Sequence, residues 1–334
     1  MIVDKITTPV GTIWAELPGV ARIQCVLPTG RIIATKVDPS TGRGIYYSDD
    51  TGTTWNAASL AESIEYTDFN NFCVTSTGRV LAGTSLGEAI AYSDNNGISW
   101  KKLTTLAGRA IKFHTLSTGR ILTAGLLSIY YSDDNGEHWT QTATQLSGTE
   151  FTCFYSLPTG RVLAGSNTHG VWYSDDDGKH WTQATKTDGT WRAFCITSTG
   201  RILAAGAGTT YDNGIWYSDD GGANWGHIIN TAGEWPSLCT LATGRILANK
   251  FNEGILYSDD NGTTWHYALT FNGRVYGFHI LPTGYVITST TADNCVRYSY
   301  PLYESDYDSK PLTKQEVLEL VAECKAYVQS KKQS

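Results

Sequence analysis

Two short patterns of polar and apolar residues alternate along the chain. In the first pattern, a Thr-Gly-Arg turn precedes a run of three apolar residues, as in the segment Thr29–Ala34. The turn glycine occurs seven times at intervals of 40 to 48 residues, and the last copy has Tyr285 in place of arginine. The turn glycines are Gly30, Gly78, Gly119, Gly160, Gly200, Gly244 and Gly284. A fixed period in this range indicates a repeat architecture.

The second pattern is Tyr-Ser-x-Asp-x-Gly-x-x-Trp. Its full copies begin at Ser48, Ser93, Ser132, Ser174, Ser218 and Ser258, and the copy at Ser93 has Asn95 at the aspartate position. A further copy is split between the chain ends, because Gly11–Trp14 matches its second half and Val296–Ser299 its first half. The split predicts a ring that closes by pairing an N-terminal strand with the C-terminal repeat, which removes exposed sheet edges.

Each repeat is expected to form four strands. The first strand runs into the Thr-Gly turn and the second is the apolar run after it. The third ends at the aromatic residue before the motif serine, and the fourth begins at the motif tryptophan. Four strands in a repeat of about 40 residues are typical of a propeller blade. The sequence therefore predicts an all-β fold, a seven-bladed β-propeller over residues 1–303 with a split closing blade.

The motif Ser-x-Asp-x-Gly-x-x-Trp resembles the Asp-box, or BNR repeat, of sialidase-like propellers. The resemblance covers roughly residues 9–300, and six full copies make it specific for the fold. It is not specific for activity, because Asp boxes occur in sialidases, xyloglucanases, sortilin-type receptors, photosystem assembly factors and phage tail proteins. The resemblance implies a non-catalytic member of the phage or bacterial binding-protein type, with the boxes on the face away from an active site.

The box residues are interpreted as folding devices. Serine and aspartate side chains accept hydrogen bonds from turn amides, glycine tolerates positive φ, and the tryptophan ring packs against the sheet. One carboxylate per turn does not supply the several oxygen ligands that calcium needs, so no metal is expected there. The residues given this structural role are Ser48, Asp50, Gly52, Trp55, Asp134, Trp139, Asp176, Trp181, Asp220, Trp225, Asp260 and Trp265.

Two further repeated positions are also given structural roles. The turn arginines recur at one repeat position, so they should be spread around the ring instead of gathered on one ligand. Five residues before each turn glycine, a ring near the central channel is expected to hold Cys25, Cys73, His114, Tyr155, Cys195, Cys239 and His279. Histidine and cysteine can bind transition metals, but these positions should be too far apart to converge on one ion. We therefore favour core packing and expect neither a metal nor a cofactor.

Charge and hydropathy exclude two classes of partner. The 334-residue chain has a net charge of −7, whereas nonspecific nucleic-acid binding needs clustered lysine and arginine. No run of 18 apolar residues is present, so no helical membrane span is expected. The N-terminus lacks the features of a signal peptide, and the seven cysteines lack paired spacing. The sequence thus predicts a protein made in the cytoplasm with reduced thiols.

The face opposite the turns and boxes is the candidate binding surface. Its loops vary between repeats, and binding residues concentrate on variable loops held by a rigid scaffold. Aromatic rings, arginines and carboxylates on these loops would suit a glycan or a protein partner, although packing between blades would explain them equally well. The candidate ligand-binding residues are Arg22, Tyr66, Asp68, Arg109, Trp191, Arg192, Trp235, Arg274 and Tyr276.

The favoured function is a non-catalytic recognition or structural module, such as a tail or decoration component of a phage virion. One alternative is a sialidase-like glycoside hydrolase, whose carboxylate pair would come from Asp68, Glu150, Asp188 and Glu234. Against it, the Arg-Ile-Pro motif of sialidases is absent and seven turns are present where sialidases have six blades. The other alternative is an intracellular scaffold that resembles the photosystem assembly factors.

Residues 304–334 depart from the repeat and are predicted to form a linker and a C-terminal amphipathic helix. Thr313–Glu316 matches a capping box, and Val317, Val321, Cys324 and Val328 fall on one helical stripe. An isolated helix of this length is marginal in water. It is therefore expected to contact either its own propeller or another subunit or partner chain, and we hypothesise the latter.

Overall fold

The computed structural model describes residues 6–8, 14–17, 22–38, 42–61, 64, 69–84, 90–103, 110, 112–125, 128–143, 149–185, 187–207, 214–228, 231–291, 296–299 and 302–303. The predicted C-terminal helix lies outside these residues. Among the described residues, none belongs to a helix that could span a membrane.

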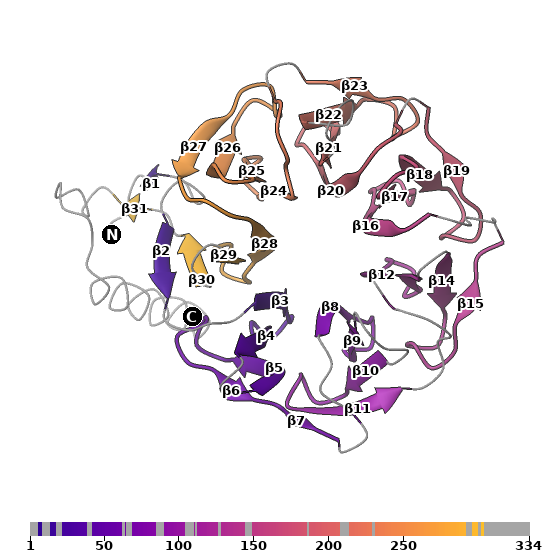
Figure 1. Cartoon of the computed structure of the whole chain (residues 1–334), viewed down its shortest axis with the longest axis vertical. Coiled ribbons are helices and arrows are strands. Elements are labelled where there is room, and N and C mark those ends of the chain that lie inside the picture. Colours follow the sequence, from indigo (N-terminus) through magenta and orange to yellow (C-terminus); the bar gives the residue numbers. More distant parts are fainter. Residues whose placement is uncertain are drawn as a thin grey trace, which may run out of the picture.

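Seven antiparallel sheets stand around a central axis, and the first strand of each sheet lies innermost (Figure 1). Blade 1 consists of β3 (Arg22–Val26), β4 (Ile32–Asp38), β5 (Gly42–Ser48) and β6 (Asn56–Ala57). Blade 2 consists of β8 (Phe69–Val74), β9 (Val80–Thr84), β10 (Ile90–Ser93) and β11 (Ser99–Leu103). Blade 3 consists of β12 (Lys112–Thr115), β13 (Ile121–Ala124), β14 (Ile129–Ser132) and β15 (Thr140–Gln141).

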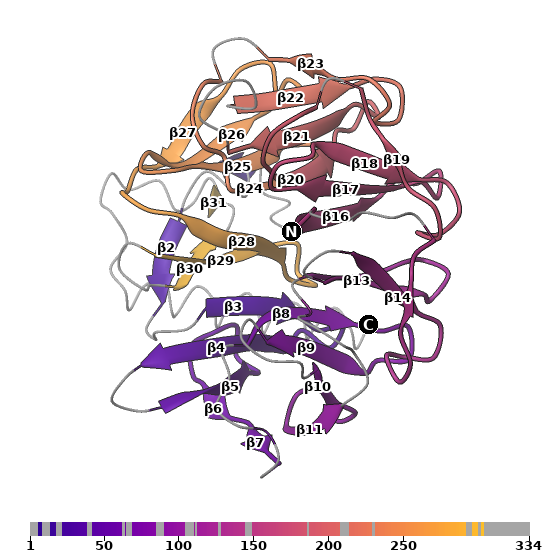
Figure 2. The ribbon, with the colours of Figure 1, turned by 45° about the vertical axis from the view of Figure 1, so that its right-hand side comes forward.

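The second half of the ring repeats this order. Blade 4 consists of β16 (Phe151–Ser156), β17 (Val162–Ser166), β18 (Val171–Ser174) and β19 (Thr182–Gln183). Blade 5 consists of β20 (Trp191–Ile196), β21 (Ile202–Gly206), β22 (Gly214–Ser218) and β23 (Gly226–His227). Blade 6 consists of β24 (Ser237–Thr240), β25 (Ile246–Lys250), β26 (Gly254–Ser258) and β27 (His266–Leu269). The oblique view in Figure 2 shows the blades stacked face against face.

The seventh blade closes the ring, which confirms the all-β, seven-bladed propeller with a split blade. Its strands are β28 (Val275–Ile280), β29 (Val286–Thr290), β30 (Val296–Ser299) and the N-terminal β2 (Trp14–Leu17). β2 pairs with β30 in antiparallel register, from Trp14 opposite Ser299 to Leu17 opposite Val296. A separate pair, β1 (Ile6–Thr8) with β31 (Leu302–Tyr303), joins the chain ends a second time.

The hydrophobic core lies between blades, so each interface is shared by neighbouring repeats. The interface of blades 3 and 4 holds Leu122, Ile129, Phe151 and Trp181, each at most 5 % exposed. A short outer strand also links two neighbouring blades. This strand, β7 (Ser59–Leu60), follows blade 1 and pairs in parallel with β11 of blade 2. The described blades thus bury their faces against their neighbours, as the units of a repeat protein do.

The serine and aspartate side chains of each Asp box form hydrogen bonds within their own turn. In the first box, the Ser48 hydroxyl accepts a hydrogen bond from the Gly52 amide at 2.8 Å and donates one to Asp50 at 2.8 Å. Asp50 in turn accepts a hydrogen bond from the Thr54 amide at 2.8 Å. The same bonds recur in the other full boxes, with Asn95 in place of the aspartate in the box at Ser93. The box glycine also packs against the preceding blade, since a Cβ on Gly178 would meet Leu122 of blade 3 at 2.7 Å.

The turn arginines join neighbouring blades. Arg120 donates to both carboxylate oxygens of Asp133, at 2.7 and 2.8 Å, and to the Asp177 carbonyl of the next blade at 3.2 Å. Its guanidinium lies over the Tyr131 ring, 4.3 Å from the centroid. The other five turn arginines, Arg31, Arg79, Arg161, Arg201 and Arg245, also lie over a tyrosine ring of their own blade. Because these contacts are internal, we assign the turn arginines a role in holding the turns and blades together and not a role in ligand binding.

Candidate functional site

The two faces of the ring differ in what they leave accessible. The turn face carries the Thr-Gly-Arg turns and the Asp boxes, whose polar groups mostly bond to one another. The opposite face, which we name the loop face, carries the connections between blades and those between the second and third strands. The predicted ligand residues were assigned to the loop face. Three of them, Tyr66, Asp68 and Arg109, lie outside the described residues.

Trp191 and Trp235 do not contribute to the accessible surface, in contrast to their predicted role. Trp191 is 0 % and Trp235 is 2 % exposed, and each packs in a core between blades. Their indole nitrogens donate hydrogen bonds of 2.7 Å to the carbonyls of Thr187 and Thr231. The packing alternative applies to both residues, because a buried tryptophan with its N–H satisfied is a structural anchor.

Arg22 and Tyr276 come together where blades 1 and 7 meet. The Arg22 guanidinium lies over the Tyr276 ring, 4.0 Å from the centroid, and Tyr276 is 40 % exposed. Two residues earlier, Arg274 forms an ion pair of 2.6 Å with Glu234 of the neighbouring blade and lies over the Phe251 ring at 4.8 Å. The structure thus brings Arg22 and Tyr276 into contact between blades 7 and 1, whereas Arg274 contacts blade 6.

Arg192 lies in a β-bulge of β20, the first strand of blade 5. In blade 5, Trp191 pairs with Gly206 while Ala193 pairs with Ala205, so Arg192 is the extra residue between them. A bulge of this kind redirects side chains near functional sites. Arg192 donates to the Asn167 amide oxygen at 3.1 Å, and Asn167 donates to Glu150 at 2.6 Å. The Arg192 Nε atom is buried without a hydrogen-bond partner among the described residues.

A small cavity of about 180 Å³ opens in the channel beside the Arg22–Tyr276 pair. Its polar lining comprises Arg22, Gln24, Asn71, Lys112, Tyr276 and His279. Lys112 was not singled out from the sequence. It stands seven residues before its turn glycine, where the other repeats have Ile23, Asn71, Cys153, Ala193, Ser237 and Gly277. An alignment of the repeats would have marked it as the one charged residue at this position of the inner strand.

The described cysteines of the inner strands keep their thiol form at neutral pH. Burial raises the pKa of the thiols of Cys73, Cys195 and Cys239 to about 12 and that of Cys153 to about 11. The thiolate is the nucleophile and the metal ligand, so these residues remain thiols in the folded protein. Their side chains fill the space between the inner strands, in line with the packing interpretation.

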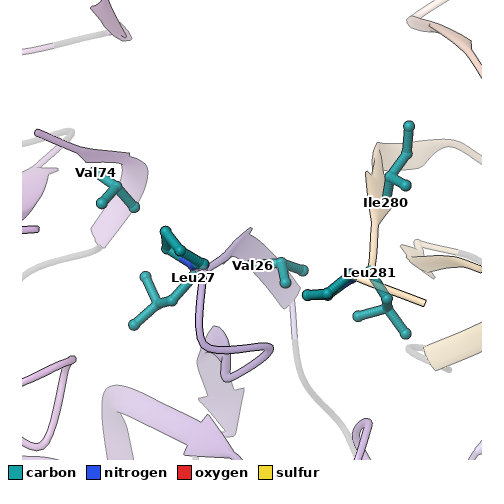
Figure 3. A pocket seen from close by; sticks show the side chains of 7 residues that line it. Val26, Leu27, Val74, Ile280 and Leu281 are labelled. Atoms are coloured by element: carbon teal, nitrogen blue, oxygen red, sulfur yellow. The ribbon is translucent and has the colours of Figure 1, made fainter. Parts of the chain in front are cut away.

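The turn-face end of the channel is apolar. Figure 3 shows Val26, Leu27, Val74, Ile280 and Leu281 around a hollow of about 300 Å³ that lies between β3, β8 and β28. Ile280 is 43 % exposed there. The channel therefore changes from cationic at the loop face to apolar at the turn face.

The low pKa values of two histidines lead us to expect a loss of stability in mild acid. Burial lowers the pKa of both His114 and His279 to about 4, whereas the unfolded chain titrates near 6.5. Between these values the unfolded chain binds more protons, so the free energy of unfolding should be constant above about pH 6.5 and fall towards pH 4, by up to about 3 kcal/mol per histidine. Asp176, with a pKa of about 2, adds nothing in this window, because its contribution is lost only below its ordinary value of 3.8.

Urea unfolding at a series of pH values checks this prediction. A double variant, His114→Gln with His279→Gln, should reduce the slope between about pH 6.5 and 4. His266→Gln, at an exposed position on β27, is the matched control and should keep the slope. An unchanged slope in the double variant would assign the acid sensitivity to other groups.

Comparisons with known proteins agree with this geometry. The BNR/Asp-box repeat family matches residues 91–102 and 256–267, and no curated protein matches the chain. Among solved structures, YCF48 bound to D1 peptide has a TM-score of 0.68 at 17% identity, over 89% of this chain and 99% of that one. YCF48 from Cyanidioschyzon merolae has a TM-score of 0.66 at 11% identity, over 89% and 100%.

An enzyme shares the fold equally well. Selenomethionine-substituted virginiamycin B lyase from Staphylococcus aureus has a TM-score of 0.68 at 11% identity, over 86% of this chain and 98% of that one. At such identities the similarity concerns the fold alone. The chain is therefore a seven-bladed propeller with BNR/Asp-box repeats, and its function must be argued from its own side chains.

Proposed function

We propose that this propeller is a recognition module that binds a protein partner through its loop face. The observation that carries the proposal is the contact of Arg22 with the exposed Tyr276, with Arg274 two residues before that tyrosine. Tyrosine and arginine are the residues most enriched at the energetic centres of protein interfaces. The arginines are held in place, Arg22 by the Tyr276 ring and Arg274 by Glu234. Held side chains lose less conformational freedom on binding, which favours affinity.

The known peptide complex of a similar fold supports a protein partner over a glycan. YCF48 carries a bound D1 peptide, so a propeller of this architecture can present a peptide site. The third function predicted from the sequence, an assembly-factor scaffold, is compatible with such a site. Membership of a phage virion stays a prediction, which mass spectrometry of purified particles would test.

The carboxylates argue against the hydrolase alternative. A glycosidase needs two carboxyl groups that flank the scissile bond, one of them free to donate a proton. Of the three described candidates, Glu234 is engaged by Arg274 at 2.6 Å, Glu150 accepts a hydrogen bond from Asn167 at 2.6 Å, and Asp188 is exposed. The carboxylates of Glu234 and Glu150 are thus engaged by neighbouring side chains, which suits a structural role better than acid catalysis.

An array of short peptides tests the proposal. Peptides that bind the full-length protein should lose at least about fivefold in affinity with Tyr276→Ala and with Arg274→Ala, the loss typical of an interface hot spot. Lys179→Ala is the matched control, because Lys179 is exposed in a box turn on the opposite face. Circular dichroism establishes that each variant is folded.

A glycan array with the same variants forms the second arm. Binding to glycans alone would replace the protein partner by a carbohydrate. Peptide binding that is unaffected by both loop-face variants, or lost equally in the Lys179 variant, would refute the loop face as the recognition surface.

A further inference from the structure

The turn-face end of the channel has an apolar sector in blades 7, 1 and 2. Four residues before the turn glycine, these blades carry Ile280, Val26 and Val74 (Figure 3). The same position holds threonine or serine in blades 3, 4 and 6 and Ile196 in blade 5. The side chains of the sector line the hollow of about 300 Å³, and Ile280 is 43 % exposed. Apolar surface gathered in an open hollow indicates a site of contact.

The closing blade also differs from the other six on the turn face. In blades 1 to 6, the turn arginine forms an ion pair with the aspartate that follows the box serine. Blade 7 has Tyr285 and Tyr300 at these two positions, so the same ion pair cannot form there. The Tyr285 ring packs edge-on against Tyr298, with 5.5 Å between centroids, and its carbonyl accepts a hydrogen bond of 2.8 Å from the amide of Leu281, which lines the hollow. Two tyrosines thus replace a charged pair in a blade that lines the hollow.

The chain leaves the ring from this same blade and face. β30 ends at Ser299, the box serine, which belongs to the turn face. β31 (Leu302–Tyr303) follows as the last described element, and residues 304–312 separate it from the capping box at Thr313. A linker of that length spans up to about 30 Å when extended, whereas the four strands of a blade cover about 15 Å. The predicted C-terminal helix can therefore reach the hollow.

We infer that the C-terminal segment of the same chain docks its apolar stripe, Val317, Val321, Cys324 and Val328, on this hollow and on the neighbouring Tyr285. Of the two contacts expected for the helix, the position of the hollow favours its own propeller. A segment tethered this close is present at an effective concentration of about a millimolar, which a separate chain rarely reaches.

Docking gives the channel one open end. The segment covers the turn-face end, where apolar side chains are otherwise exposed, and the loop face stays accessible to a partner. The inference concerns the face opposite the proposed recognition surface and does not rest on the proposed function.

Alkylation of Cys324 tests the inference. The full-length protein is treated with N-ethylmaleimide, and mass spectrometry follows the modification of Cys324, the cysteine of the stripe. Cys324 should react at least about tenfold more slowly in the folded protein than in urea, because the reagent reaches a docked thiol only when the segment opens. Cys73 and Cys195, which are 8 % and 3 % exposed in the ring, report whether the propeller itself stays folded.

A substitution in the hollow links the protection to this site. Ile280→Asn should raise the alkylation rate of Cys324 at least about fivefold, because it removes apolar surface from the contact. Ile98→Asn is the matched control and should leave the rate unchanged, since Ile98 is 42 % exposed in the box turn of blade 2. Asparagine is neutral, so neither variant changes the charge near the thiol.

A second variant covers the case in which Ile280→Asn does not fold. Val321→Asn lies in the C-terminal segment, outside the strands of the ring, and should raise the rate as much as Ile280→Asn. Circular dichroism and the unmodified Cys73 establish that the propeller of each variant is folded.

Three results overturn the inference. Equal rates for Cys324 in the folded protein and in urea would show an undocked segment, available to another partner. Protection that persists in Ile280→Asn and in Val321→Asn would place the contact elsewhere. Protection that increases with protein concentration, together with a dimeric mass in light scattering, would make a second copy the occupant. Protection at a monomeric mass that does not depend on concentration and is lost in both variants supports docking within one chain.

Discussion

Trp181→Ala should lower the free energy of unfolding by about 3–5 kcal/mol, the loss expected for truncating a buried tryptophan. Trp181 is 5 % exposed, and its indole nitrogen donates to the Gly178 carbonyl at 3.0 Å. Its ring contacts Phe151 and Phe154 of its own blade and lies in the core shared with blade 3. The substitution therefore removes packing from one blade and from the interface with its neighbour.

Urea unfolding followed by tryptophan fluorescence measures this loss. Trp181→Phe keeps most of the ring volume and should retain more than half of the stability that alanine loses. Peptide binding by the folded fraction should be unchanged, because the box lies far from the loop face. A selective loss of binding at an unaltered melting temperature would contradict the structural role of the box.

Gly254→Ala should lower the free energy of unfolding by about 2–5 kcal/mol, the sum of a left-handed backbone penalty and overpacking. Gly254 begins β26 with φ at +121°, and a Cβ there would meet the Leu269 carbonyl oxygen at 2.0 Å. That oxygen belongs to the neighbouring strand β27, so it can move only if the pairing of the two strands shifts.

Gly160→Ala is the matched control for this substitution. Gly160 also has positive φ, at +92°, but a Cβ there would meet no atom within 4 Å. Its substitution should cost only the backbone penalty, about 1–2 kcal/mol. Thermal denaturation of both variants measures the difference, and equal losses would show that the close approach at Gly254 is relieved without strain.

The candidate site was only partly predictable from the sequence. Arg22 and Tyr276 were expected on the loop face, and the structure brings their side chains into contact. Trp191 was expected beside them, but the bulge at Arg192 interrupts the alternation of side chains along β20, so that Trp191 packs in the core. A shift of one residue moves a side chain to the other face of a strand. The same bulge lies eight residues before the turn glycine in blades 2, 4 and 5, so its place follows the repeat, but the alternation of residues within one strand does not reveal it.

The repeat period, the turn chemistry and the split box determined the architecture of this protein by themselves. These signals are local: each Thr-Gly turn and each box specifies its own backbone, and the half-boxes at the chain ends specify ring closure. Only the tertiary structure decided which residues meet in the channel. Arg22, Lys112 and His279 line one cavity and come from blades 1, 3 and 7. Their proximity depends on the radius of the closed ring, which no spacing along the chain encodes.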